Sequence, residues 1–135
     1  MVDDDNRVTE QLAAIEALGF KMLVDDFGTG YSSLSQLQRL DMDVLKVDKA
    51  FTAQLCNGKE GEAFFMAIVS MAHVLGMGVV AEGVETAEQL HLLQTLSCNE
   101  VQGYLISKPL PAHEIPPLLR KRFLFPPFSH ILSAV

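Results

Sequence analysis

The run KMLVDDFGTG, residues 21–30, decides how this chain folds. An apolar stretch leads into two adjacent aspartates and then into a glycine-rich turn. The pattern predicts a short buried strand over 21–25 that ends in the turn 26–30. Glycine suits positions 28 and 30 because it adopts positive φ without steric penalty. The strand therefore carries Asp25 and Asp26 to its carboxyl end.

Strands and helices alternate along the rest of the chain. Apolar runs predict three further strands, over 44–48, 78–81 and 101–105. Helical spacing predicts helices over 8–18, 33–40, 62–75 and 86–96, the last opened by a capping box of Thr86 and Gln89. This order indicates an α/β fold of βαβ units, with a parallel sheet and flanking helices. Periodicity alone leaves open a (β/α) barrel or an open doubly wound sheet.

The predicted strand ends share a chemical character. The first three strands end at or beside Asp25, Asp48 and Glu82, and the fourth presents Gln102 and Gly103. Parallel sheets of both kinds place their sites at the carboxyl ends of the strands. The sequence therefore predicts one polar site at that rim.

Size and charge limit the classes of partner. The chain has 135 residues, 49% of them hydrophobic and 20% charged, which fits one globular domain. A formal net charge of -7 argues against binding a DNA or RNA polymer or an anionic membrane. No apolar run reaches the length of a membrane span, and the first residues are acidic, so we expect a cytoplasmic segment whose parent protein could be membrane-anchored. Cys56 and Cys98 are expected to be free thiols.

The adjacent aspartates are candidate metal ligands. Carboxylates at a strand end can bind divalent cations, and paired metals recur in phosphodiester hydrolysis. The alternative is structural, with Asp26 opening an Asx-turn and Asp25 capping a helix.

Two further groups have both structural and chemical interpretations. Lys46 and Asp48 point to the same face of their strand, where they form either a mutual ion pair or part of a phosphate site. Glu82 follows an apolar strand directly, whereas Glu85 could simply favour the positive end of the next helix. Gln102 is either ordinary strand packing or a group that orders a water or a base edge.

Four ordered segments together resemble the EAL phosphodiesterase family. They are DDFGTGYSSL (25–34), LKVD (45–48), VAEGVET (80–86) and QGYL (102–105) followed by KPLP (108–111). The similarity covers roughly residues 8–115. It implies a TIM-like (β/α)8 barrel that hydrolyses cyclic di-GMP to linear pGpG with Mg²⁺ or Mn²⁺.

The resemblance also implies residue roles at the metal centre. Asp25 matches the carboxylate that bridges two metals, and Asp26 matches a ligand of one of them. Lys46 is similar to the lysine that holds the attacking water and neutralises phosphate charge, with Asp48 orienting it. Glu82 matches the glutamate that handles the metal-site water as a general base.

Two more roles follow from the same likeness. Gln102 matches the glutamine near the attacking water. Glu85 matches the glutamate that keeps the loop Phe27–Ser33 in its competent shape, and that loop resembles the segment coupling dimerisation to activity. Phe27, Gly28, Thr29 and Gly30 are therefore loop-positioning candidates.

Several family features are missing from these residues. In that family the signature Glu-Ala-Leu triplet and a metal-binding asparagine and glutamate lie upstream of these four segments; the Glu16-Ala17-Leu18 run here stands in the predicted helix 8–18 and is not that signature. We therefore expect residues 1–115 to form the C-terminal half of an EAL domain and 116–135 a helix and apolar tail. Alone, such a half is expected to be inactive and, because its sheet edges are bare, to form a homodimer or be complemented by another half-barrel. The rival interpretations are a non-catalytic EAL-like receptor or interaction module, and an unrelated metal-dependent hydrolase.

Overall fold

The computed structural model describes residues 2–30 and 33–121, with side chains from residue 6 onward. Four strands form one parallel sheet in the order β1-β2-β3-β4: Leu23–Phe27, Val44–Val47, Gly78–Ala81 and Glu100–Val101. The helices are α1 Val2–Ala17, α2 Leu34–Arg39, α3 Lys49–Gln54, α4 Lys59–Val74, α5 Ala87–Thr95 and α6 Ile115–Leu119, with a 3-10 turn at Ala112–Glu114. The predicted α/β class with four parallel strands is confirmed.

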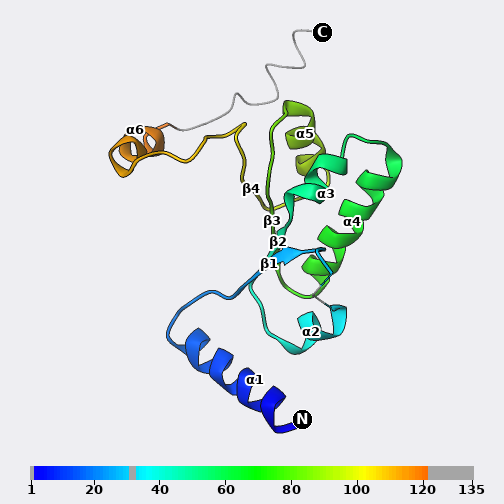
Figure 1. Ribbon diagram of the computed structural model, residues 1–135, viewed down its shortest axis with the longest axis vertical. Helices are drawn as coiled ribbons and strands as arrows, with labels where there is room; N and C mark the ends of the chain where they lie inside the picture. The colour runs from blue at the N-terminus through cyan, green and yellow to red at the C-terminus, as the bar shows by residue number, and fades with distance from the viewer. Residues whose placement is uncertain (1, 31–32, 122–135) are drawn as a thin grey trace.

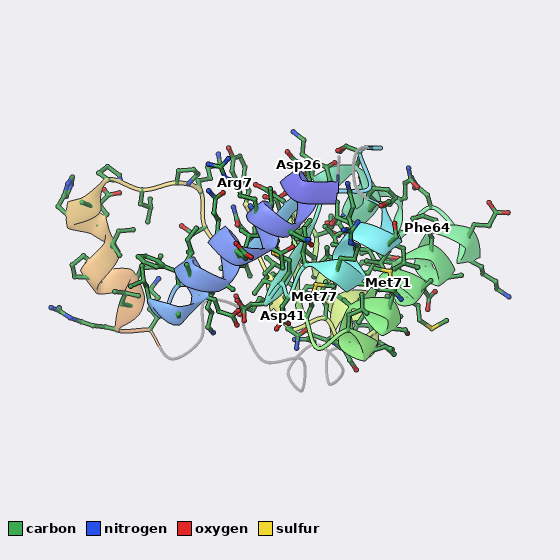
Figure 2. All side chains as sticks on the ribbon, turned by 90° about the horizontal axis from the view of Figure 1, so that it is seen from below. Arg7, Asp26, Asp41, Phe64, Met71 and Met77 are labelled. Carbon is green, nitrogen blue, oxygen red and sulfur yellow. The ribbon has the colours of Figure 1, made fainter. Side chains whose placement is uncertain are left out.

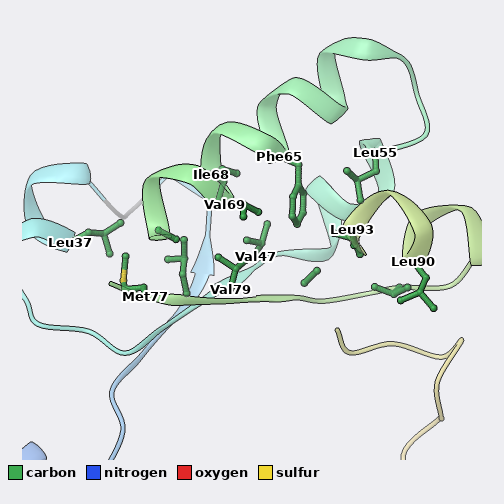
Figure 3. Close-up of a cluster of buried hydrophobic side chains, with 14 residues drawn as sticks. Leu37, Val47, Leu55, Phe65, Ile68, Val69, Met77, Val79, Leu90 and Leu93 are labelled. Carbon is green, nitrogen blue, oxygen red and sulfur yellow. The ribbon is translucent and has the colours of Figure 1, made fainter. Parts of the chain in front are cut away.

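The sheet has one covered face. Helices α3, α4 and α5 lie together on one side of the strands, whereas α1 and α6 extend away from the sheet (Figure 1). Alternation along β2 places Leu45 and Val47 in the core, fully buried, and turns Lys46 to the other face. Figure 3 shows the core between sheet and helices, where Phe65, Val69 and Leu93 meet the strand residues.

Helix starts follow local capping chemistry. Ser33 opens α2 and Thr86 opens α5, each through a full capping box with the glutamine three residues later. Each box satisfies backbone N–H groups that a helix start leaves without partners. The capping box expected at Thr86 and Gln89 is thus confirmed.

The ends of two predicted strands were wrong, and one helix was missed. β1 runs through both aspartates to Phe27 instead of ending at Asp25. β4 ends at Val101, so Gln102 lies just beyond it, because the backbone bends there to pass Val84. Helix α3 was not predicted, since six residues give too short a run for helical periodicity.

The N-terminal part of the fold leaves apolar side chains exposed. They are Val8, Ile15, Leu18, Phe20 and Leu23, between 41% and 76% exposed. Leu23 is the first residue of β1, which is an edge of the sheet.

Helix α6 has prolines in its first turn, where their missing N–H groups would lack partners anyway. Of the predicted helix and apolar tail over 116–135, residues 122–135 lie outside the described residues, as do Tyr31 and Ser32 of the Phe27–Ser33 loop. Within 2–30 and 33–121, no helix is long and apolar enough to cross a membrane. Cys56 and Cys98 are free thiols, as expected.

Candidate active site

A bulge in β1 brings both aspartates to one site. Val24 pairs with Leu45 and Phe27 with Val47, so Asp25 and Asp26 together stand opposite Lys46 alone. In a regular strand, adjacent side chains point to opposite faces; two residues against one defines a bulge and re-aims them. Asp26 takes φ +53°, a left-handed conformation that aspartate tolerates better than most residues.

Three carboxylates converge at this rim of the sheet. Oxygens of Asp25, Asp26 and Glu82 all lie within 4.8 Å of one another. Asp25 and Asp26 come from the bulge in β1. Glu82 directly follows β3, which is separated from β1 by β2. Oxygen atoms of carboxylates are the ligands that hard divalent cations such as Mg²⁺ and Mn²⁺ take. The set fits a divalent ion, which Asp25 and Asp26 would hold with Glu82 beside them.

Lys46 lies among these carboxylates on the intervening strand. Its Nζ is 2.6 Å from Glu82 Oε1 and 3.6 Å from Asp25 Oδ1, and its side chain is only 19% exposed. The hydrogen bond to Glu82 raises the pKa of Lys46 above its usual value, and the charges of Glu82 and Asp25 act in the same direction against partial burial. Lys46 is therefore a fixed cation at the site.

An open pocket of about 450 Å³ adjoins the carboxylate cluster. Glu82 belongs to both. Its lining comes from the segments that follow β2, β3 and β4: Asp48, Lys49, Glu82, Gly83, Glu85, Gln102, Gly103 and Tyr104. Each predicted catalytic residue except Lys46 thus borders one cavity. Lys46 reaches that cavity through Glu82.

Two candidates also have structural duties. Asp48 is the N-cap of α3, where its Oδ1 accepts from the Ala50 N–H at 2.9 Å, and Lys46 pairs with Glu82 and Asp25. Of the two alternatives for Lys46 and Asp48, the mutual ion pair is not formed, and Lys46 makes these pairs instead. Glu85 donates its backbone N–H to Gln89 Oε1 in the capping box of α5. Its side chain still lines the pocket.

The turn after β1 is closed by Thr29. Its N–H donates to Asp26 O at 3.3 Å and its hydroxyl donates to the same oxygen at 2.8 Å. The Asp26 N–H donates to Asp25 Oδ1 at 2.8 Å. Asp26 therefore turns the chain through its backbone carbonyl, whereas the Asx-turn alternative would have used its side chain.

Sequence reasoning gave no role to two lining residues, Lys49 and Tyr104. Lys49 follows Asp48 at the start of α3, the helix that was not predicted. Tyr104 stands in the quoted QGYL segment, and Lys108 Nζ lies 5.7 Å from the centre of its ring. A cation over an aromatic face is a favourable contact that the spacing of four residues could have suggested.

Comparison with known proteins places this geometry in a family. The EAL domain model matches residues 1–109. The chain belongs to the EAL-domain family. NbdA of Pseudomonas aeruginosa, a cyclic di-GMP phosphodiesterase, is 46% identical over 109 residues. That match covers 81% of this chain and 14% of NbdA.

Solved EAL structures share the fold. The MucR phosphodiesterase of P. aeruginosa in complex with cyclic di-GMP superposes with a TM-score of 0.75 at 40% identity, covering 83% of this chain and 45% of that one. BlrP1 of Klebsiella pneumoniae, solved with manganese and cyclic di-GMP, gives a TM-score of 0.68 at 39% identity over 74% of this chain and 26% of BlrP1. The chain thus spans less than half of each of these proteins and matches part of the EAL TIM barrel.

Proposed function

We propose that these residues supply the C-terminal half of a cyclic di-GMP phosphodiesterase centre, which within a complete EAL domain hydrolyses cyclic di-GMP to pGpG. One observation carries the proposal: Asp25, Asp26 and Glu82 converge within 4.8 Å around the fixed cation Lys46, in a chain of the EAL family. A relative solved with manganese and cyclic di-GMP supports the choice of ligands. We assign residues 1–115 to this half-domain and 116–135 to a helix and tail.

Each residue of the centre has a distinct task in this proposal. Asp25 and Asp26 would hold Mg²⁺ or Mn²⁺, with Asp25 able to bridge a pair, and the ions would supply Lewis acidity at the phosphodiester. Lys46 offsets phosphate charge and holds the attacking water. Glu82 would accept the proton of that water, since it lines the pocket beside Lys46, which would hold the water.

The pocket residues complete the water site in this proposal. Asp48 and Gln102 flank Glu82 and would orient the water and the lysine. Glu85 and the turn Phe27–Gly30 would hold the centre in its reactive shape. A net charge of -7 opposes binding of an anionic nucleotide, so Lys46 and divalent ions provide the local attraction.

A chimera provides the test. Residues 1–121 would replace the aligned segment of the MucR phosphodiesterase, and pGpG formation with Mn²⁺ would be followed by chromatography. We expect turnover, and we expect Lys46→Met and Glu82→Gln each to lower it by about 100-fold or more, as loss of a charge-stabilising group does. Asp41→Asn, an exposed acidic residue outside the site, is the matched control. A chimera that binds cyclic di-GMP with native affinity but forms no pGpG would contradict hydrolysis and favour the receptor interpretation.

We further propose that the 135-residue chain pairs with a second half-barrel, in solution a second copy of itself. The exposed apolar side chains of Val8, Ile15, Leu18 and Phe20 come before Leu23, the first residue of the free edge strand β1. Exposed apolar surface together with an uncovered edge favours association. Sedimentation should give a dimer whose fraction rises with concentration. Leu18→Asp and Phe20→Asp should shift it to monomer, whereas Val74→Asp, at a still more exposed position on α4, should not. A compact monomer at high concentration would contradict this pairing.

A further inference from the structure

Helix α3 lies between the two turns that carry the carboxylates. A Cβ atom built on Gly28, after Asp26, would fall 2.0 Å from Phe51 Cε2. A Cβ on Gly83, after Glu82, would fall 2.5 Å from Lys49 Cβ. Side-chain atoms do not approach this closely, so both turns touch the first turn of α3 through faces that only glycine offers.

The Gly28 contact has a second aromatic layer behind it. The rings of Phe51 and Phe64 stack with centroids 5.3 Å apart and planes 8° from parallel. Phe51 comes from α3 and Phe64 from α4, two helices that pack side by side. The backbone at Gly28, the Phe51 ring and the Phe64 ring therefore form one continuous stack from the acidic turn to the outside of α4.

We propose that Phe51 is a positioning residue for Asp26, with Phe64 holding the Phe51 ring against the turn. The proposal rests on the metal-dependent function proposed above. Gly28 is two residues from Asp26, and Thr29 closes the turn with two hydrogen bonds to Asp26 O. In so short a turn, a shift of Gly28 changes the backbone of Asp26, which already holds a left-handed φ of +53°. The Phe51 ring thus fixes where the Asp26 carboxylate stands relative to Asp25 and Glu82.

Burial distinguishes Phe64 from ordinary core packing, whereas Phe51 is partly buried against the main core. Phe64 is 55% exposed, whereas its neighbour Phe65 is 1% exposed in the main core. Figure 2 labels Phe64 and Asp26 on α4 and β1. A side chain that keeps half its surface in water contributes less to the core than Phe65 does. Phe65 is therefore the matched control, because the same substitution on the same helix tests stability without the stack.

Amide hydrogen exchange in the 135-residue chain tests the positioning role directly. The readout is the exchange rate of the Thr29 N–H, which donates to Asp26 O, relative to the Ser97 N–H, which donates to Gln94 O in a similar turn. Phe51→Leu should raise this ratio about three- to tenfold, the effect expected from losing one aromatic pair. Phe64→Leu should raise it in the same direction by less. Phe65→Leu should speed both amides together and leave the ratio unchanged.

Mn²⁺ affinity is the second readout. Binding to the chain, followed by proton relaxation of water, should weaken about three- to tenfold in Phe51→Leu and remain at the wild-type value in folded Phe65→Leu. An unchanged exchange ratio in Phe51→Leu and Phe64→Leu would overturn the proposal. So would a Phe51→Leu variant that binds Mn²⁺ as tightly as a wild type that binds it. If the wild type binds no Mn²⁺, the metal function fails, and the exchange ratio still decides whether Phe51 fixes the turn.

Discussion

Lys46 is the residue around which the acidic side chains gather. Lys46 is on β2, between the strands that lead to Asp25 and Glu82, and its ammonium pairs with both carboxylates. Its side chain is only 19% exposed to solvent. Taking it away would leave three carboxylates within 4.8 Å of one another without a cation, and like charges at that distance repel. Lys46 therefore stabilises the fold as well as the site.

Lys46→Met should lower the free energy of unfolding by about 1–2 kcal/mol, between the values for exposed and for buried ion pairs. Urea denaturation at neutral pH with a chelator present measures it. Lys21→Met, at an exposed position before β1, is the control and should change stability little. A loss no larger than that of the control would contradict the ion-pair account.

The ion pair between Lys46 and Glu82 also predicts how the stability of the fold depends on pH. The pKa of Lys46 is raised in the folded state above 10.5, so the folded state binds the proton more tightly. This contribution is complete below the unfolded pKa and is lost as pH rises through the raised folded pKa. In metal-free buffer, the stability difference between wild type and Lys46→Met should therefore be constant near neutral pH and shrink above pH 10.5. A stability difference that grows as the pH rises above 10.5 would contradict a raised pKa of Lys46 in the folded state.

At the scale of single residues, the sequence predicted the members of the site but not their arrangement. The adjacent aspartates and Glu82 could be named because they stand at predicted strand ends, and Lys46 because it shares a strand face with Asp48. The bulge that turns both aspartates inward could not, since it depends on the register between β1 and β2. Periodicity within one strand contains no information about that register.

Helix α5 shows how an element positions a site residue. Thr86 accepts from the Gln89 N–H, and Gln89 Oε1 accepts from the Thr86 and Glu85 N–H groups. The box therefore fixes the backbone of Glu85 at the pocket wall. Its sequence signature, threonine followed by glutamine three residues later, made it predictable.

Thr86→Ala should cost about 1 kcal/mol of unfolding free energy, because the helix start loses an acceptor. Thermal or urea unfolding measures it. Thr95→Ala is the matched control in the same helix: its hydroxyl donates back to His91 O, a bond that adds little to helix stability. Equal losses in the two variants would show that the cap does not hold α5.

Helix α3 was missed for a reason that matters for the site. Residues 49–54 make a single helical stretch too short to show a period. The strand pattern places Asp48 in the predicted strand 44–48, on the same face as Lys46. Its φ and its bond to the Ala50 N–H instead make it the helix cap. Short helices after strands are found from capping residues, so an aspartate ending a predicted strand deserves both interpretations.

The whole molecule is a sheet with one finished face. Among residues 2–30 and 33–121, helices cover the side bearing Leu45 and Val79, and none covers the side bearing Lys46 or the edge at β1. Complete (β/α)8 barrels have eight strands, and the described residues supply four. The parallel order was predictable from the alternation of strands and helices. Closure of the sheet into a barrel was not, because it depends on the residues at both edges that would have to pair.

This incompleteness predicts the behaviour of the 135-residue chain in an assay. Purified monomer should form no measurable pGpG from cyclic di-GMP with Mn²⁺, because loss of one charge-stabilising contact alone costs about 10²–10³ in rate. Chromatography after long incubation measures it, with the MucR chimera as positive control. Metal-dependent pGpG from monomer fractions would refute the need for a second half.

The most direct test of the central claim is Mn²⁺ titration of the 135-residue chain, followed by paramagnetic broadening in ¹H–¹⁵N spectra, which detects even weak binding residue by residue. Broadening should centre on Asp25, Asp26 and Glu82 at low ratios of metal to protein. Asp26→Asn, which keeps a residue suited to positive φ, should abolish it, whereas Asp41→Asn should leave it unchanged. Broadening spread evenly over acidic residues, or unaffected by Asp26→Asn, would contradict a metal centre at the ends of β1 and β3.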